Sequence, residues 1–117
     1  MSITEKLDIL APFEIWEVLL DNTTIKFHEP LMLQPVPLPD DPEEPSRPGE
    51  NRYWLVECPE LDISTCGEDR REMHNGILSD IRDAWKHIVS IPDDKISPRG
   101  KKIKEAYLAI AEEVMDE

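Results

Sequence analysis

Cysteine is scarce in this chain: Cys58 and Cys66 are the only two among 117 residues. Two thiols are too few for the disulfide scaffold of a small secreted protein, so we expect reduced thiols and a cytoplasmic location. The two cysteines lie eight positions apart with no second ligand pair, a spacing that does not fit a structural zinc site.

Glycine and long apolar runs are also scarce. The four glycines are scattered, which excludes a glycine-rich phosphate-binding loop: Gly49, Gly67, Gly76 and Gly100. No apolar stretch approaches the ~18 residues of a membrane-spanning helix. The polar start, Met1 to Asp8, does not have the charged-then-apolar pattern of a secretory leader. We therefore expect no membrane partner.

Positively charged residues are also few. The chain has 13 Lys and Arg against 26 Asp and Glu, a formal net charge of −13. Such a surface repels the phosphates of nucleic acids and would attract a basic partner over a long range. An acidic composition is also an ordinary solubility feature. We expect no nucleic-acid binding.

The best-defined part of the chain is a strand, a second strand and a helix between residues 52 and 89. Tyr53 to Val56 is a bulky apolar run typical of a buried strand. Pro59 ends this strand because proline has no N–H for a neighbouring strand. Ile63 to Cys66 predicts a second short strand, and Gly67 permits the tight turn after it.

A helix is predicted over residues 70–89. Asp69 lies three residues before Glu72, which is the capping-box spacing at a helix start. Apolar residues then recur every three or four positions and form one stripe: Met73, Ile77, Ile81, Trp85 and Ile88. We expect this stripe to pack on one face of a sheet.

Residues 53–89 resemble the core of the HicB-like family. The family pattern is a strand ending in proline, a few residues, Gly-Asp-Thr or Gly-Glu-Thr, then Glu and a helix with an aliphatic stripe. Here Cys-Pro-Glu-Leu at 58–61 is followed by Gly-Glu-Asp at 67–69 and by Glu72. Three positions depart from the pattern: Asp62 replaces a small residue, Asp69 the usual threonine and Met73 the usual alanine. Aspartate caps a helix as well as threonine does.

The resemblance implies an α+β fold, with a small antiparallel sheet and the 70–89 helix on one face. The length of 117 residues predicts a single domain over residues 1–117. The resemblance also implies a non-enzymatic binding role, because HicB-like proteins are similar to antitoxins that mask a small basic ribonuclease toxin. Many members carry a DNA-binding module after the core. The residues after Val89 match neither a ribbon-helix-helix nor a helix-turn-helix, so DNA binding is not carried over.

The N-terminal stretch Phe13 to Leu20 allows two structures. A strand would place alternate residues on opposite faces: Phe13, Ile15 and Leu19 on one, and Trp16, Val18 and Leu20 on the other. A helix would instead align Phe13, Trp16 and Leu20. Asp21-Asn22 is a turn signal, and 24–28 favours a strand, so we prefer a hairpin and leave the helix open.

Proline dominates the middle of the chain, where seven of the 11 prolines lie between Pro30 and Pro48. Leu31 to Val36 can extend the sheet only at an edge. Residues 37–51 combine proline with acidic residues and have almost nothing apolar to bury, which predicts a flexible loop. A proline-rich ligand for an aromatic groove is the alternative interpretation of this loop.

A second helix is predicted over about 98–115, continuing towards residue 117. Ser97 is a favoured cap and Pro98 a favoured first residue. The apolar face would be Ile103, Tyr107, Ile110, Ala111 and Val114. The basic start and acidic end oppose the helix dipole by roughly 0.3–1 kcal/mol per charge, so the last turn should fray.

No catalytic, cofactor or metal site is predicted. The candidate nucleophiles, bases and ligands share no recognisable spacing: Cys58, Cys66, His28, His74 and His87. His74 and His87 lie more than 100° apart around an ideal helix and cannot share a metal. Both cysteines are expected to pack as small apolar side chains in or near the sheet, with a reactive Cys66 thiolate as the alternative.

The basic cluster Lys95, Arg99, Lys101, Lys102 and Lys104 is expected to be a solvated face that balances local acids, with phosphate binding as the alternative. Three functions follow. The leading one is a HicB-like binding protein with a basic toxin as partner. The second is a solitary module that self-associates, with a homodimer through a sheet edge. The third is a small enzyme that uses Cys66 or carboxylates.

Overall fold

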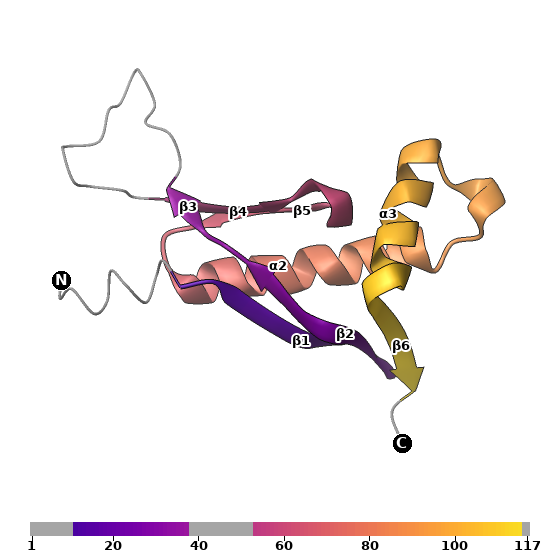
Figure 1. Cartoon of the computed structure of the whole chain (residues 1–117), viewed down its shortest axis with the longest axis horizontal. Coiled ribbons are helices and arrows are strands. Elements are labelled where there is room, and N and C mark those ends of the chain that lie inside the picture. Colours follow the sequence, from indigo (N-terminus) through magenta and orange to yellow (C-terminus); the bar gives the residue numbers. More distant parts are fainter. Residues whose placement is uncertain (1–10, 38–52, 116–117) are drawn as a thin grey trace, which may run out of the picture.

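The computed structural model describes residues 11–37 and 53–115. Its centre is helix α2 (Arg70–Ala84), which lies between two antiparallel sheets of three strands each (Figure 1). One sheet has the order β1-β2-β6, with bounds Phe13–Leu19, Thr23–Leu33 and Ala111–Met115. The other has the order β3-β4-β5, with bounds Val36–Pro37, Trp54–Cys58 and Ile63–Gly67. The predicted α+β class is confirmed.

Short helical segments complete the described chain. Pro59–Leu61 (η1) and Asp93–Lys95 (η3) are 3-10 turns, and helix α3 (Pro98–Ile110) crosses the end of α2 (Figure 1). None of the helices within residues 11–37 and 53–115 is long and apolar enough to cross a membrane. The predicted flexible loop at 37–51 lies outside the described residues except for Pro37, which ends β3.

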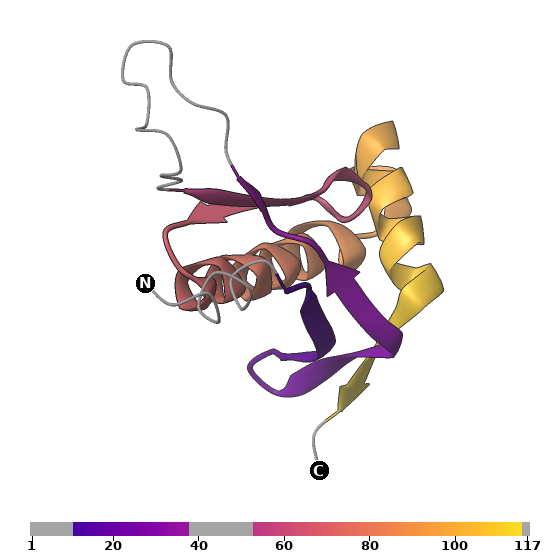
Figure 2. The same cartoon turned by 60° about the vertical axis from the view of Figure 1, so that its left-hand side comes forward.

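The division into two sheets corrects the expectation of one sheet. The chain passes from β2 through Gln34 and Pro35 into β3, so one continuous stretch contributes a strand to each sheet (Figure 2). Pro35 is fully buried and has no N–H to donate to a neighbouring strand. Because the ladder is interrupted there, β2 pairs with β1 and β6, whereas β3 pairs with β4. The predicted edge position is confirmed: among the described strands, residues 31–33 pair with β1 alone, and Val36–Pro37 is an edge of the other sheet.

The preferred hairpin of β1 with β2 is confirmed, and the helical alternative is wrong. The set of β1 side chains that point into the core differs from the prediction, because an irregularity between Ile15 and Glu17 shifts the register. Val18 therefore joins Phe13 and Ile15 in the core, while Leu19 is exposed. An odd shift of this kind turns every later side chain to the other face of the sheet.

The start of α2 matches the prediction. The Asp69 carboxylate accepts a hydrogen bond from the Glu72 N–H at 2.8 Å, and the Glu72 carboxylate accepts one from the Glu68 N–H at 3.4 Å. The stripe is buried at Met73, Ile77, Ile81 and Trp85 and partly buried at Ile88. The helix ends in a π-helical turn, Trp85–Val89 (η2), in which the Ser90 N–H donates to the Trp85 carbonyl.

The second helix is shorter than predicted. It starts with the expected cap, since Ser97 Oγ accepts from the Gly100 N–H at 3.1 Å, but it ends at Ile110 and not near residue 115. Ala111 is extended, and Ala111–Met115 forms β6 against Thr23–Phe27 of β2. If residues 111–115 were helical, their carboxylates would lie at the negative end of the helix dipole, which is unfavourable. The strand instead places the Glu113 carboxylate where it accepts a hydrogen bond from Trp85 Nε1.

Close packing of α2 on β5 depends on Gly76. A Cβ at this position would lie 2.0 Å from Thr65 Oγ1 and 3.0 Å from Thr65 Cβ. Thr65 is β-branched and sits in a strand, so its side chain has few other rotamers to adopt. Glycine therefore sets the distance between helix and sheet, although it weakens the helix by ~1 kcal/mol relative to alanine.

Gly76→Ala should lower the free energy of unfolding by about 1–3 kcal/mol, because the added methyl group overpacks the interface and outweighs the gain in helix propensity. Urea unfolding measures this change. Asn75→Ala, at the exposed neighbouring position, is the control and should change little. In a double-mutant cycle, Thr65→Ala should recover part of the loss. Equal stability of Gly76→Ala and wild type would contradict the packing.

Candidate functional site

The face of sheet β1-β2-β6 that points away from α2 is the first candidate surface, and we call it the outer face. Residues directly opposite each other on neighbouring strands share a face. One row across the outer face is Glu17–Lys26–Glu112, and Glu14 lies opposite Met32. A second row is Leu19–Thr24–Val114, in which Thr24 is buried and Val114 is partly buried. The other side of the same strands buries the core residues Phe13, Ile15, Val18, Ile25, Phe27 and Leu33.

Large apolar side chains are exposed on or beside the outer face. Leu19 is 60% exposed and Met32 53% exposed, and Trp16, at the register irregularity, is 57% exposed. No helix among the described residues covers this face, because α2 packs on the opposite side of the sheet (Figure 2). Exposed apolar groups rimmed by polar residues are typical of protein-binding surfaces.

The edge strands of the two sheets differ in the hydrogen bonds that their backbone groups make. Side chains of α2 bind backbone atoms of the nearby strands: Arg82 Nε donates to the Leu19 carbonyl at 2.9 Å, and Asp80 Oδ2 accepts from the Ser64 N–H at 3.0 Å. Burial raises the pKa of the Asp80 carboxyl, while the bond from Ser64 opposes that shift. On the far side of its sheet, β6 is hydrogen-bonded to β2 alone among the described strands.

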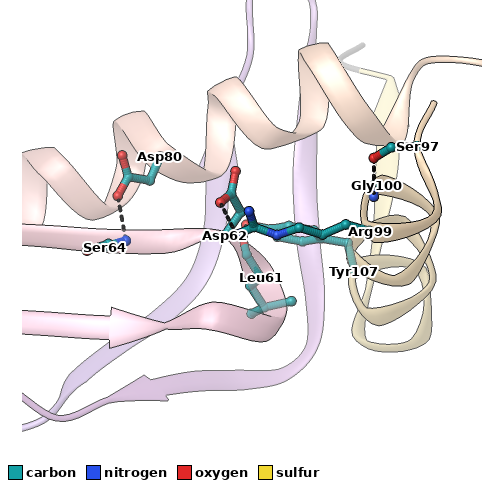
Figure 3. A network of polar contacts seen from close by, with 8 residues as sticks. All are labelled: Leu61, Asp62, Ser64, Asp80, Ser97, Arg99, Gly100 and Tyr107. Atoms are coloured by element: carbon teal, nitrogen blue, oxygen red, sulfur yellow. Dashed lines mark hydrogen bonds and ion pairs between the residues drawn. The ribbon is translucent and has the colours of Figure 1, made fainter. Parts of the chain in front are cut away.

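A shallow pocket of about 310 Å³ lies where the turn after β4 meets the ends of α2 and α3. Its polar lining includes Asp62, His87 and Arg99, and its apolar lining is Ile88, Ile96 and Ile103. Asp62 has a positive φ of 56°, and its carboxylate lies 3.8 Å from Arg99 (Figure 3). Because Asp62 and Arg99 are paired with each other, neither side chain offers an unpaired charge to a ligand in this pocket.

Tyr107 holds this corner of the molecule together. Its hydroxyl donates to the Leu61 carbonyl at 2.5 Å (Figure 3). Its ring meets Trp85 edge-on, with centroids 5.9 Å apart. Burial is the main reason that the pKa of Tyr107 is raised, so the hydroxyl remains a hydrogen-bond donor. One side chain thus connects α3, the end of α2 and the turn at Asp62.

Tyr107→Phe should destabilise the fold by about 1–3 kcal/mol, because the Leu61 carbonyl would be left without its buried donor. Thermal and urea unfolding measure the loss. Tyr53→Phe is the matched control, since Tyr53 is 47% exposed and its hydroxyl can bond to water. Equal stability of the two variants would contradict a structural role for the Tyr107 hydroxyl.

The two cysteines lie at opposite ends of the β4–β5 ladder, with Cys58 opposite Ile63 and Cys66 opposite Leu55. Cys58 is partly buried, and its thiol donates to Glu60 Oε2 at 3.3 Å. Burial, followed by the Glu60 carboxylate, raises the pKa of Cys58, so little thiolate forms at neutral pH. Cys66 is exposed, so the expectation that it packs as an apolar side chain is wrong.

The two thiols should therefore react with an alkylating reagent at different rates. At pH 7.5, iodoacetamide should modify Cys66 at least about tenfold faster than Cys58, because Cys58 is both shielded and held protonated. Peptide mass spectrometry over a time course measures both rates. Glu60→Gln removes the carboxylate that raises the Cys58 pKa and should speed labelling of Cys58 alone. A faster reaction at Cys58 in the wild-type protein would contradict this account.

The structure places the three histidines considered in the sequence analysis in three different surroundings. His74 stacks on the Phe13 ring with centroids 6.1 Å apart, His87 lines the pocket, and His28 is exposed on β2. The Arg70 guanidinium also lies over the Phe13 ring, 4.0 Å from its centroid. Within residues 11–37 and 53–115, no group of three or more His, Cys, Asp or Glu is placed to hold a metal ion.

The basic cluster at 95–104 is partly neutralised by neighbouring oxygens. Lys104 Nζ lies 2.9 Å from an Asp93 carboxylate oxygen and donates to the Ile91 carbonyl at 2.7 Å. The Lys104 ammonium group lowers the pKa of Asp93. Arg99 faces Asp62, while Lys95, Lys101 and Lys102 are exposed. This arrangement is that of a solvated face balanced by local acids.

Comparisons with protein-family models, with curated proteins and with solved structures found no match to this chain. The HicB-like resemblance therefore depends on the motif at 53–89 alone.

Sequence reasoning did not identify the outer face. The strand pattern placed Leu19 with the core residues Phe13 and Ile15, and the β6 residues were assigned to a helix. One signal was present: Trp16, Leu19 and Met32 are large apolar residues in strands that also carry Glu14, Glu17 and Lys26. Such mixed alternation is compatible with a sheet face that binds a partner.

Proposed function

We propose that this protein works without catalysis, by binding a basic protein partner on the outer face of the β1-β2-β6 sheet. The observation that carries the proposal is the exposure of Trp16, Leu19 and Met32 among carboxylates on a sheet face that no described helix covers. A few buried anchors, most often Trp, Tyr or Arg, supply most of the binding energy in protein interfaces, and complementary charges favour the correct partner.

The charge of the surface defines the class of partner. Glu14, Glu17 and Glu112 outnumber Lys26 on the outer face, and the whole chain carries a formal net charge of −13. A basic protein would be steered towards this surface, and its association rate would fall as salt increases. If the HicB-like resemblance of residues 53–89 reflects ancestry, the partner is a small basic ribonuclease toxin, and the complex forms in the cytoplasm.

A homodimer through a sheet edge is the second candidate. The observation that favours it is β6, an edge strand hydrogen-bonded to β2 alone among the described strands. Pairing of two copies would bury that edge and add apolar contacts from Val114 and Met115. In this case the protein is a solitary self-associating module.

Substitution of the exposed apolar residues tests the proposal. The triple variant Trp16→Ser, Leu19→Ser, Met32→Ser should lose at least about 2 kcal/mol of binding, roughly 30-fold in Kd. Immobilised wild-type and variant proteins are incubated with lysate of the source organism at low and moderate salt. Captured proteins are identified by mass spectrometry, purified and titrated, and their ribonuclease activity is measured free and bound.

The control is Leu108→Ser, which removes an exposed apolar side chain from α3, 50% exposed against 53–60% for the three substituted residues. It should bind the captured partner like the wild type. A small basic ribonuclease that loses activity in the complex supports the antitoxin role. Capture of no basic protein at either salt, or equal capture by the triple variant, contradicts the proposal. A stable dimer by light scattering that captures no partner supports the solitary module.

A further inference from the structure

The free edge of β6 is a second, distinct feature of the same sheet. In the order β1-β2-β6, both β1 and β6 pair with β2 alone among the described strands; the Leu19 carbonyl at the end of β1 accepts from Arg82, and β6 is the edge where the charged row Glu17–Lys26–Glu112 ends in a carboxylate. An edge strand presents a row of N–H and C=O groups that another extended segment can pair with. Strand addition at such an edge is a common mode of peptide recognition.

We propose that β6 accepts an extended basic segment of the partner as a fourth strand of the sheet. This inference rests on the proposed function, since it specifies how the basic partner is held. The occupant is defined by the two rows that end at β6. In the row Glu17–Lys26–Glu112 the charges alternate from strand to strand, so a Lys or Arg next to Glu112 continues the alternation.

The neighbouring row of residues specifies a second residue type in the partner segment. Leu19–Thr24–Val114 ends in an aliphatic side chain, so the added strand should offer an apolar residue beside Val114. Glu112 and Val114 are two positions apart and share the outer face. The partner segment should therefore carry one basic and one apolar residue separated by a single position. Glu113 points to the other face, where it accepts the hydrogen bond from Trp85.

The same charges disfavour a second copy of the chain at this edge. In the antiparallel register that pairs all five β6 residues of two copies, Glu113 faces its own counterpart. The alternative register centred on Glu112 places Glu112 opposite its counterpart. Like charges directly opposite each other destabilise a strand pair. A basic strand avoids both contacts and retains the backbone hydrogen bonds.

The test uses the full chain and a capped seven-residue peptide, Thr-Val-Thr-Lys-Thr-Val-Thr, which reads the same in both strand directions. Amide hydrogen exchange and chemical shifts are followed by NMR as the peptide is added to millimolar concentration. The expected result is slower exchange at amides within 112–115, with the peptide binding at least about tenfold tighter than its analogue with Glu in place of Lys. A second control peptide has proline at the two Thr positions beside Lys and should not protect these amides.

Two charge-reversal variants distinguish pairing at the β6 edge from general electrostatic attraction to an acidic protein. Glu112→Lys should reverse the preference between the Lys and Glu peptides, whereas Glu105→Lys makes the same charge change at an exposed site on α3 and should not. If the Lys peptide shifts Trp16 and Leu19 signals without protecting β6, or leaves all signals unchanged, the edge inference is overturned. The proposed function still stands if the captured partner binds wild type but not the triple variant. Self-association that Glu112→Lys abolishes would assign the edge to a second copy and overturn the inference.

Discussion

Burial of α2 between two sheets is the constraint on which the rest of the structure depends. Met73, Ile77 and Ile81 are fully buried, and Gly76 lets the helix approach Thr65 of β5 closely. The polar side chains Arg82 and Asp80 then bind backbone groups of the flanking strands. A single helix thereby fixes both sheets, while the outer face of β1-β2-β6 and the edge of β6 lie on the side away from it.

The parts of the fold that local patterns determine could be predicted from the sequence. The Asp69 cap, the buried stripe ending at Trp85 and the strands around Pro59 follow from spacing and composition within a few residues. The β1–β2 hairpin was also predictable, because the turn signal at 21–22 lies between two runs with strand propensity. These features need no knowledge of distant parts of the chain.

The parts that depend on distant contacts could not be predicted. Residues 111–115 continue the apolar spacing of α3, and only pairing with β2 and the Trp85–Glu113 bond make them a strand. The register irregularity beside Trp16 has one indirect signal, Pro30 in the stretch of β2 that is left out of the pairing, and this signal does not reveal that Leu19 is exposed. Both candidate binding surfaces depend on these features, which explains why the fold class was predictable and the site was not.

The pairing of β2 with β6 also has a consequence for how the chain is made. Thr23 lies opposite Met115, so the hydrogen bonds of this strand pair connect residues from the two ends of the described chain. Loop closure over such a separation is slow compared with formation of a local hairpin. During synthesis, the β1–β2 hairpin can form while its β6 position is still empty. For that interval β2 is itself an open edge, whose unpaired backbone groups are available to other extended segments before β6 is made.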